Sequence, residues 1–197
     1  MKPRAADDYA QVDEIAWQAF PEAFSEGGIR WKLLHVSPEV GAWTAIFDCP
    51  KGSAFARHVH LGPGEYLLTK GKMEVRGGKE KGGATALAPA YGYEACNARH
   101  DRTYFPVASA FYMTFLGPLH FIEQDGATRA VVDWEQVQAL WASQIAAAGK
   151  PGKTGAARQT ARPLSPRPSR PAPPGSLPPG APRPAARIRS SRVRPRA

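Results

Sequence analysis

The sequence has few of the residues that define several large classes of protein. Only two cysteines occur among 197 residues, and Cys49 and Cys96 lack the C-x-x-C spacing of cysteine-based zinc or redox sites. They are too few for a disulfide framework, and we expect both to be small buried apolar residues. The N-terminal stretch has no signal-like apolar run, and no segment approaches the roughly 20 apolar residues that span a membrane. We therefore expect a soluble, cytoplasmic protein without a membrane partner.

Acidic residues are absent from one end of the chain. Residues 150–197 contain 12 Lys and Arg, 12 of the 20 prolines and no Asp or Glu. Residues 1–149 therefore hold 14 basic and 17 acidic groups, a net charge of −3. A segment so rich in proline and like charge has little to bury, so we expect it to be disordered with polyproline character. The chain thus divides into a globular domain, 1–149, and a disordered basic tail, 150–197.

Three roles stay open for this tail. Its charge suits an arm for nucleic acid or another anionic partner, although we do not expect nucleic acid to be bound elsewhere. Its PxxP-like segments, such as residues 163–166, suit a proline-binding partner. It can also be an extension without a selected role, including one that arose from an altered reading frame.

Helical patterns are scarce in the globular part, where short runs of β-branched and aromatic residues alternate with turn-forming residues. The expected strands are residues 29–35, 42–48, 54–60, 65–70, 72–76, 85–88, 103–107, 110–116 and 120–122. This pattern predicts an all-β fold, an antiparallel barrel or jelly roll. One C-terminal helix is expected after its cap Asp133, ending at Gly149, with one apolar face formed by Val137, Leu140, Trp141 and Ile145.

Histidine is also scarce, yet two of the five histidines form the sequence His58-Val59-His60. Residues two apart on a strand project from the same face, so both imidazoles can reach one ion. An isolated H-x-H pair is more often two ordinary strand histidines. We expect His35 and His120 to be structural or exposed.

The surroundings of this pair resemble the first cupin motif. Its frame is present, one position shorter than usual at the far end, as Gly52, His58, His60, Glu65 and Gly71. The second cupin motif is less regular: its frame is recognisable in Gly83, Pro89 and Gly92, but the expected histidine position near Ala95 is empty. His100 has to supply that third ligand. In this context we expect the H-x-H pair to bind a metal.

Longer strings carry a closer resemblance. They are PEAFSEGGIRWKLLH, WTAIFDCPKGSAFARHVHLGPGEYLLTKGKMEVRGG, APAYGYE and FYMTFLGPLHFI. Over about residues 20–145 the chain resembles the acetylacetone-cleaving (diketone-cleaving) dioxygenases of the cupin superfamily. The resemblance implies a single-domain cupin that uses Fe(II) and O₂ to cleave a carbon–carbon bond of a β-diketone; from acetylacetone it would give acetate and methylglyoxal. It also implies a homo-oligomer, a tetramer in that family.

The same resemblance implies roles for individual residues. The Fe(II) ligands would be His58, His60 and His100, with Glu65 present but not ligating, although related cupins recruit this carboxylate. Hydrophilic site residues would be Tyr66, Arg76, Glu94 and Thr103, and the apolar pocket would be formed by Phe55, Phe111 and Phe115. Strand alternation agrees for Phe111 and Phe115, but it places Phe55 opposite the histidines unless the strand bends near Ser53. Arg76 and Glu94 fit an ordinary surface ion pair equally well.

Three neutral imidazoles leave a divalent ion with its full charge, which favours an anionic bidentate ligand such as a β-diketone enolate. The same ligands also hold catalytic zinc, so the choice of iron depends on the resemblance. Two alternative functions stay open. One is a cupin dioxygenase acting on hydroxyacetophenone-type ketones, and the other is a non-catalytic metal-binding sensor or interaction protein.

Overall fold

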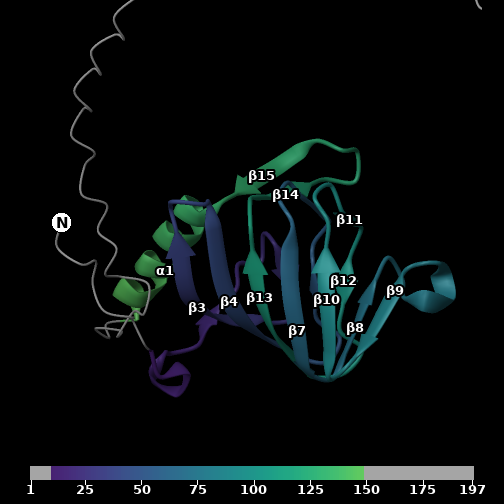
Figure 1. Ribbon diagram of the computed structural model, residues 1–197, viewed down its shortest axis with the longest axis horizontal. Helices are drawn as coiled ribbons and strands as arrows, with labels where there is room; N and C mark the ends of the chain where they lie inside the picture. The colour runs from purple at the N-terminus through teal and green to yellow at the C-terminus, as the bar shows by residue number, and fades with distance from the viewer. Residues whose placement is uncertain (1–9, 149–197) are drawn as a thin grey trace, which may run out of the picture. The chain divides into compact units, whose positions relative to one another are not determined.

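The computed structural model describes residues 10–148, which form antiparallel strands followed by one helix (Figure 1). The expected all-β class with a C-terminal helix is confirmed for this range. The tail, 150–197, and the expected domain end at Gly149 lie outside the described residues. None of the helices within residues 10–148 has both the length and the apolar character needed to cross a bilayer.

The largest sheet has six strands in the order β1-β3-β4-β13-β7-β10, and each neighbouring pair is antiparallel. Its strands are β1 (Gln18–Ala19), β3 (Arg30–Ser37), β4 (Ala42–Cys49), β7 (Gly64–Lys70), β10 (Ala90–Glu94) and β13 (Ser109–Phe115). Alternation along these strands sends one set of side chains into the core. The largest buried members of that set are Trp31, Leu33, Trp43, Phe47, Leu68, Phe111 and Phe115.

Two smaller sheets complete the fold. One has the order β11-β6-β14-β15 and contains β6 (His58–His60), β11 (Arg99–His100), β14 (Leu119–Ile122) and β15 (Thr128–Val132). The other has the order β2-β5-β12-β8-β9 and contains β2 (Ser25–Glu26), β5 (Ala54–Phe55), β8 (Lys72–Val75), β9 (Ala84–Leu87) and β12 (Thr103–Tyr104). Short 3₁₀ turns occur at Val12–Glu14 and Lys79–Lys81. All three sheets contribute side chains to one interior cavity.

The expected continuous strand over residues 54–60 is wrong. The chain leaves the extended path at Ala56 and Arg57, so β5 and β6 belong to different sheets. The Ala56 N–H donates to the Phe24 carbonyl oxygen at 2.9 Å, and the Ala56 carbonyl accepts from the His58 ring at 2.7 Å. These bonds hold Ala56 outside a regular ladder.

Helix α1 (Trp134–Ala147) begins with the expected cap. The Asp133 carboxylate accepts hydrogen bonds from the backbone N–H groups of Glu135 and Gln136, and the Gln136 side chain accepts from the Asp133 N–H. This reciprocal pattern is a capping box. The helix ends at Ala147, and the expected stop at Gly149 lies outside the described residues.

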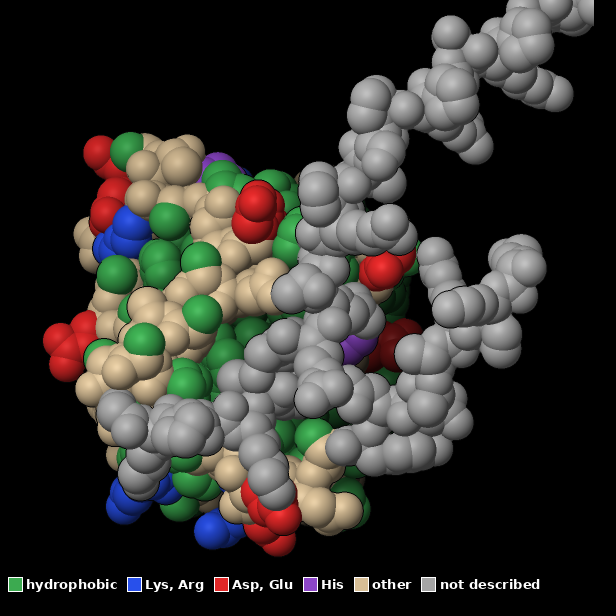
Figure 2. Space-filling view, turned by 90° about the vertical axis from the view of Figure 1, so that its left-hand side faces the viewer, with side chains coloured by type: hydrophobic (Ala, Val, Ile, Leu, Met, Phe, Trp, Pro, Cys, Tyr) green, Lys and Arg blue, Asp and Glu red, His purple; other side chains and the backbone are tan. Residues whose placement is uncertain are grey.

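The apolar face of α1 packs on the core. Val137 and Trp141 are buried, and the Trp141 ring meets the Trp31 ring edge-on at 5.3 Å. The Trp31 indole N–H also donates to the Gln144 side chain at 3.1 Å. On the molecular face that includes α1, hydrophobic side chains are scattered among polar ones (Figure 2). The helix therefore closes the core beside β3 and presents a mixed surface outward.

The two cysteines differ in environment. Cys49 is buried, as expected, and its burial followed by the charge of Asp48 raises the pKa of its thiol. Cys96 is exposed, so the expectation that it is buried is wrong. It lies in the loop after β10, where its thiol donates to the Leu61 carbonyl oxygen at 3.2 Å.

Candidate metal centre

The three predicted ligand histidines meet inside the fold. His58 and His60 project inward from β6, and His100 lies directly opposite His58 on the paired strand β11. Their exposed fractions are only 5%, 1% and 3%. One ring nitrogen from each lies within 4.8 Å of those of the other two. The expected cluster is therefore present, with His100 completing it across the β6–β11 pair.

Hydrogen bonds to the far side of two rings orient them toward the cluster. The His58 Nδ1–H donates to the Ala56 carbonyl oxygen at 2.7 Å, which leaves Nε2 with its lone pair facing inward. His100 Nδ1 lies 3.3 Å from the Thr103 hydroxyl oxygen. Such partners fix the tautomer and the angle of a metal-binding imidazole. His60 differs, because its buried Nδ1 has no hydrogen-bond partner among the described residues.

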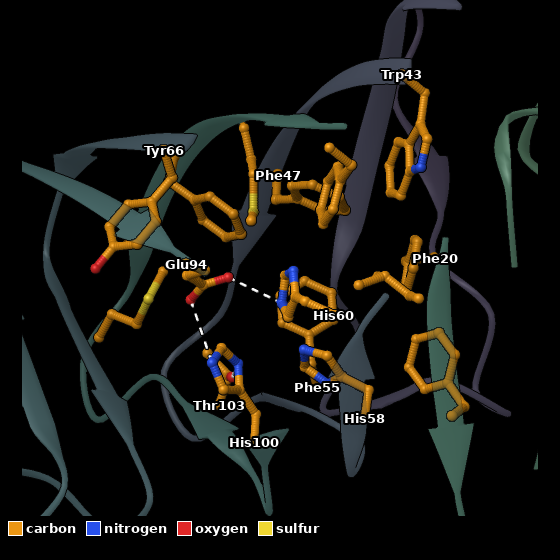
Figure 3. A pocket seen from close by; sticks show the side chains of 16 residues that line it. Phe20, Trp43, Phe47, Phe55, His58, His60, Tyr66, Glu94, His100 and Thr103 are labelled. Atoms are coloured by element: carbon orange, nitrogen blue, oxygen red, sulfur yellow. Dashed lines mark hydrogen bonds and ion pairs between the residues drawn. The ribbon is translucent and has the colours of Figure 1, made fainter. Parts of the chain in front are cut away.

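A carboxylate completes the polar part of the site. Glu94, at the end of β10, lies 2.9 Å from His60 Nε2 and 3.5 Å from His100 Nε2 (Figure 3). Burial by itself raises the pKa of Glu94, but the hydrogen bond with His60 and the three nearby imidazoles lower it further than burial raises it. The net effect is a pKa below the usual value, so Glu94 is ionised at neutral pH.

Two of the imidazoles, those of His58 and His100, are neutral at this pH. Burial, reinforced by His100 and His60, lowers the pKa of His58 to about 3. Burial also lowers the pKa of His100, although Glu94 opposes that change. Because a metal binds the deprotonated ring nitrogen, protons compete weakly for these two ligands.

An aromatic cavity of about 30 Å³ surrounds the cluster. Besides the three histidines, its lining contains Phe55, Tyr66, Glu94, Thr103, Phe111 and Phe115, all predicted site residues. The sequence reasoning missed seven other lining residues: Phe20, Trp43, Phe47, Met73, Met113, Leu119 and Phe121. Strand alternation was sufficient to find Trp43 and Phe47, which share the inner face of β4. It offers no signal for Phe20, which lies outside any strand.

Phe55, Arg76 and Glu65 differ in whether their side chains reach the cavity. Phe55 reaches the cavity because the chain bends at residues 56–57, rather than near Ser53. Arg76 is exposed, does not line the cavity, and donates to the Arg99 carbonyl oxygen at 3.5 Å instead of pairing with Glu94. Glu65 is exposed and interacts with the Tyr91 hydroxyl, on the opposite face of β7 from Tyr66.

The residues present fit a divalent transition metal. Ring nitrogens of three buried histidines converge, and two of the rings are held by hydrogen bonds on the far side of the ring. Imidazole ligands suit iron, zinc, copper and nickel alike. Inside an antiparallel β-barrel this arrangement defines a cupin with a three-histidine metal centre.

Comparison with known proteins agrees with this class. Residues 5–120 match the ChrR cupin-like domain family. The acetylacetone-cleaving enzyme of Acinetobacter johnsonii is 57% identical over 140 residues, which cover 71% of this chain and 92% of that protein. The chain belongs to the family of acetylacetone-cleaving enzymes, which confirms the resemblance seen in the sequence.

Two solved structures extend the agreement to the fold. An acetylacetone dioxygenase from Acinetobacter johnsonii superposes with a TM-score of 0.69 at 56% identity, covering 73% of this chain and 97% of the other. A protein from Methylibium petroleiphilum PM1, provisionally assigned as an acetylacetone dioxygenase, also gives 0.69, at 66% identity, covering 72% and 99%. The expected cupin fold is thereby confirmed.

Proposed function

We propose that the protein is a dioxygenase that uses Fe(II) and O₂ to cleave a carbon–carbon bond of β-diketones such as acetylacetone. The observation that carries the proposal is the buried His58, His60 and His100 cluster in the lining of an aromatic cavity. Membership of the acetylacetone-cleaving family supports the substrate class. For acetylacetone, C₅H₈O₂, addition of O₂ and rupture of the bond between the central carbon and one carbonyl carbon give acetic acid and methylglyoxal, which balances all atoms.

Fe(II) held by three neutral imidazoles would supply a dicationic Lewis acid for an enolate and reactivity toward O₂. The first contribution of the protein's own residues to substrate binding is electrostatic. None of the three ligands is anionic, and the nearby Glu94 carboxylate becomes neutral when it takes up the proton of the diketone, so the enolate with its two oxygens meets a positive site. The aromatic wall excludes bulk water from it, which strengthens that attraction.

The ionised Glu94 is the proposed acceptor for the proton that the diketone loses from its central carbon. Its carboxylate lies at the histidine cluster and faces the cavity. Tyr66 lines the same cavity, and burial, followed by the charge of Glu94, raises the pKa of its phenol. The phenol therefore stays neutral and adds no second negative charge beside the enolate. Thr103 acts through His100, whose ring it orients.

The narrow cavity favours small aliphatic diketones over hydroxyacetophenone-type ketones. Its volume of about 30 Å³ leaves little room beside the histidines, and most of its lining is rigid aromatic rings. An aromatic ketone requires several of these rings to move. A small planar enolate requires less rearrangement, so we expect turnover to fall as the substrate becomes larger.

Metal analysis of the purified protein, followed by oxygen uptake with a panel of β-diketones, tests the function. The expected result is about one iron per chain and uptake of one O₂ per acetylacetone, with acetate and methylglyoxal as products. Iron binding without oxygen uptake on any diketone would instead indicate the sensor or interaction protein. Zinc as the bound metal, with no activity after iron loading, would contradict the cofactor.

Glu94→Gln is expected to lower turnover of acetylacetone by about 100-fold or more while retaining the metal, because the amide has the same shape but accepts no proton. Steady-state kinetics and metal analysis of the same preparation measure both effects. Glu65→Gln is the matched control, because that carboxylate is exposed on the opposite side of the sheet. Loss of metal in Glu94→Gln would identify Glu94 as a ligand and remove it as the proton acceptor.

The proposal includes a homo-oligomer in a reducing, cytoplasmic compartment. The outer face of the six-stranded sheet exposes Leu67, Tyr91, Tyr93 and Tyr112, an apolar composition typical of contacts between subunits. Cys49 and Cys96 are both free thiols, which suits a reducing environment. Light scattering measures the number of subunits, and cell fractionation tests the location.

Residues 150–197 are expected to be dispensable for catalysis, because a segment with 12 positive charges, no negative charges and 12 prolines cannot join the barrel core. A chain ending after Gly149 is expected to match the full-length protein in metal content, turnover and oligomeric state. Any binding of the tail to polyanions or to the globular domain should weaken with salt. Loss of turnover at full metal occupancy in the shortened chain would show that the domain boundary is wrong.

A further inference from the structure

Gly92 occupies a position where a side chain would collide with the cavity wall. It lies on β10 directly opposite Tyr66 of β7. A Cβ atom at residue 92 would lie 2.2 Å from the Tyr66 ring carbons Cε1 and Cζ and 2.5 Å from its hydroxyl oxygen. These separations are far inside van der Waals contact, so the Tyr66 ring fills the space of the missing side chain.

The glycine is not required by its backbone. Within residues 10–148, nine other glycines have positive φ angles, which favour glycine, but Gly92 is not among them. Residue 92 is also a regular ladder position in β10, where any amino acid is sterically allowed. The requirement for glycine therefore comes from the Tyr66 ring.

Tyr66 in turn forms one wall of the substrate cavity. Its ring lies 6.4 Å from Phe111 at a steep angle, and its hydroxyl points away from His60 (Figure 3). Glu94 follows Gly92 by two residues, so both face the same side of β10. A side chain at residue 92 would stand beneath the ring and lift it off β10, into the space beside Glu94.

We propose that Gly92 is a positioning residue that sets the width of the substrate cavity by seating the Tyr66 ring flat against β10. This inference rests on the proposed diketone-cleaving function. With glycine at residue 92 the Tyr66 ring rests against β10, and the cavity keeps its full width for the diketone. With a larger residue the wall moves inward, and longer diketones lose more than acetylacetone does.

The test is Gly92→Ala, assayed with acetylacetone and with heptane-3,5-dione, which is longer by one methylene at each end. The expected result is a fall in kcat/KM for the longer substrate that exceeds the fall for acetylacetone by about tenfold, the selectivity that a few methylenes provide in an apolar pocket. Metal content is expected to stay at the wild-type level. Anaerobic titration calorimetry with both diketones should show the same selectivity in binding.

A double-mutant cycle assigns the effect to Tyr66. In a Tyr66→Ala background, which has its own lower rate, adding Gly92→Ala is expected to cause no further change in selectivity, because no ring remains to be displaced. Tyr66→Ala alone should shift selectivity the opposite way, toward the longer diketone. That variant keeps the proposal testable if Gly92→Ala does not fold. Gly77→Ala controls for glycine replacement as such, since Gly77 has a positive φ and lies outside the cavity lining.

The results with the wild-type protein and with Gly92→Ala distinguish failure of the positioning role from failure of the proposed diketone-cleaving function. If the wild-type protein turns over diketones and Gly92→Ala has an unchanged substrate profile, the positioning role is wrong and the function stands. An equal Gly92→Ala effect with and without the Tyr66 ring would also overturn the role. If the iron-loaded wild-type protein neither binds nor cleaves any diketone, both proposals fail.

Discussion

Replacing His100 with alanine is expected to remove most of the bound metal and to lower turnover by more than about 100-fold. Losing even an outer partner of a metal ligand often costs that much in affinity or activity, and His100 is one of the three histidines that the described part of the chain brings together at the site. His58→Ala and His60→Ala should behave alike. Metal content per chain and oxygen uptake with acetylacetone are the measurements.

The fold should survive these replacements, because the surrounding core is built from aromatic and aliphatic side chains that do not need the metal. Circular dichroism and thermal melting check this. His120→Ala is the matched control, since that half-buried ring bonds to the Thr128 hydroxyl at 2.9 Å and is not part of the cluster. Wild-type metal content in His100→Ala would place the third ligand elsewhere. Glu94 would then be the first candidate, because Glu65 lies on the outer face.

How much of this centre is readable from the sequence varies by residue. Strand alternation puts the rings of His58 and His60 on one face, since their residue spacing is two, but the cupin frame around them was needed to predict that they bind a metal. The position of His100 does not follow from alternation, because it stands on a two-residue strand whose register with β6 depends on long-range pairing. Only the family resemblance identified it before the structure did.

Tertiary contacts also explain the mistakes. Simple alternation placed Phe55 on the opposite side of the strand from the histidines, because no local sequence signal predicts the bend at Ala56. That bend is held by a hydrogen bond to the Phe24 carbonyl, which belongs to a distant segment of the chain. Cys96 was expected to be buried because cysteine is usually a buried residue type, but it lies in a loop after β10 and is exposed. The short strand β11 and the other two-residue strands contain too few residues to show any periodicity.

Phe111→Leu and Phe115→Leu are expected to reduce turnover far more than metal content, because these rings line the cavity in which we propose that the substrate binds. Phe111 stacks on Phe47 with ring centroids 4.9 Å apart, and Phe115 stacks on Trp43 at 3.7 Å. The Phe115 ring is also nearly parallel to that of His60, at 6.1 Å. Leucine keeps the site apolar but removes the flat surface that we propose confines a planar enolate.

Stability has to be separated from this effect, since full truncation of a buried phenylalanine to alanine costs about 3–5 kcal/mol. The leucine replacements limit that loss, and Phe105→Leu provides the control. Phe105 is fully buried and its ring lies 5.9 Å from that of Phe111, yet it does not line the cavity. It should lose a similar amount of stability and keep its turnover when assayed well below its melting temperature. Wild-type kinetics on several diketones in both Phe111→Leu and Phe115→Leu, or an equal loss of turnover in Phe105→Leu, would show that these phenylalanines serve only the core.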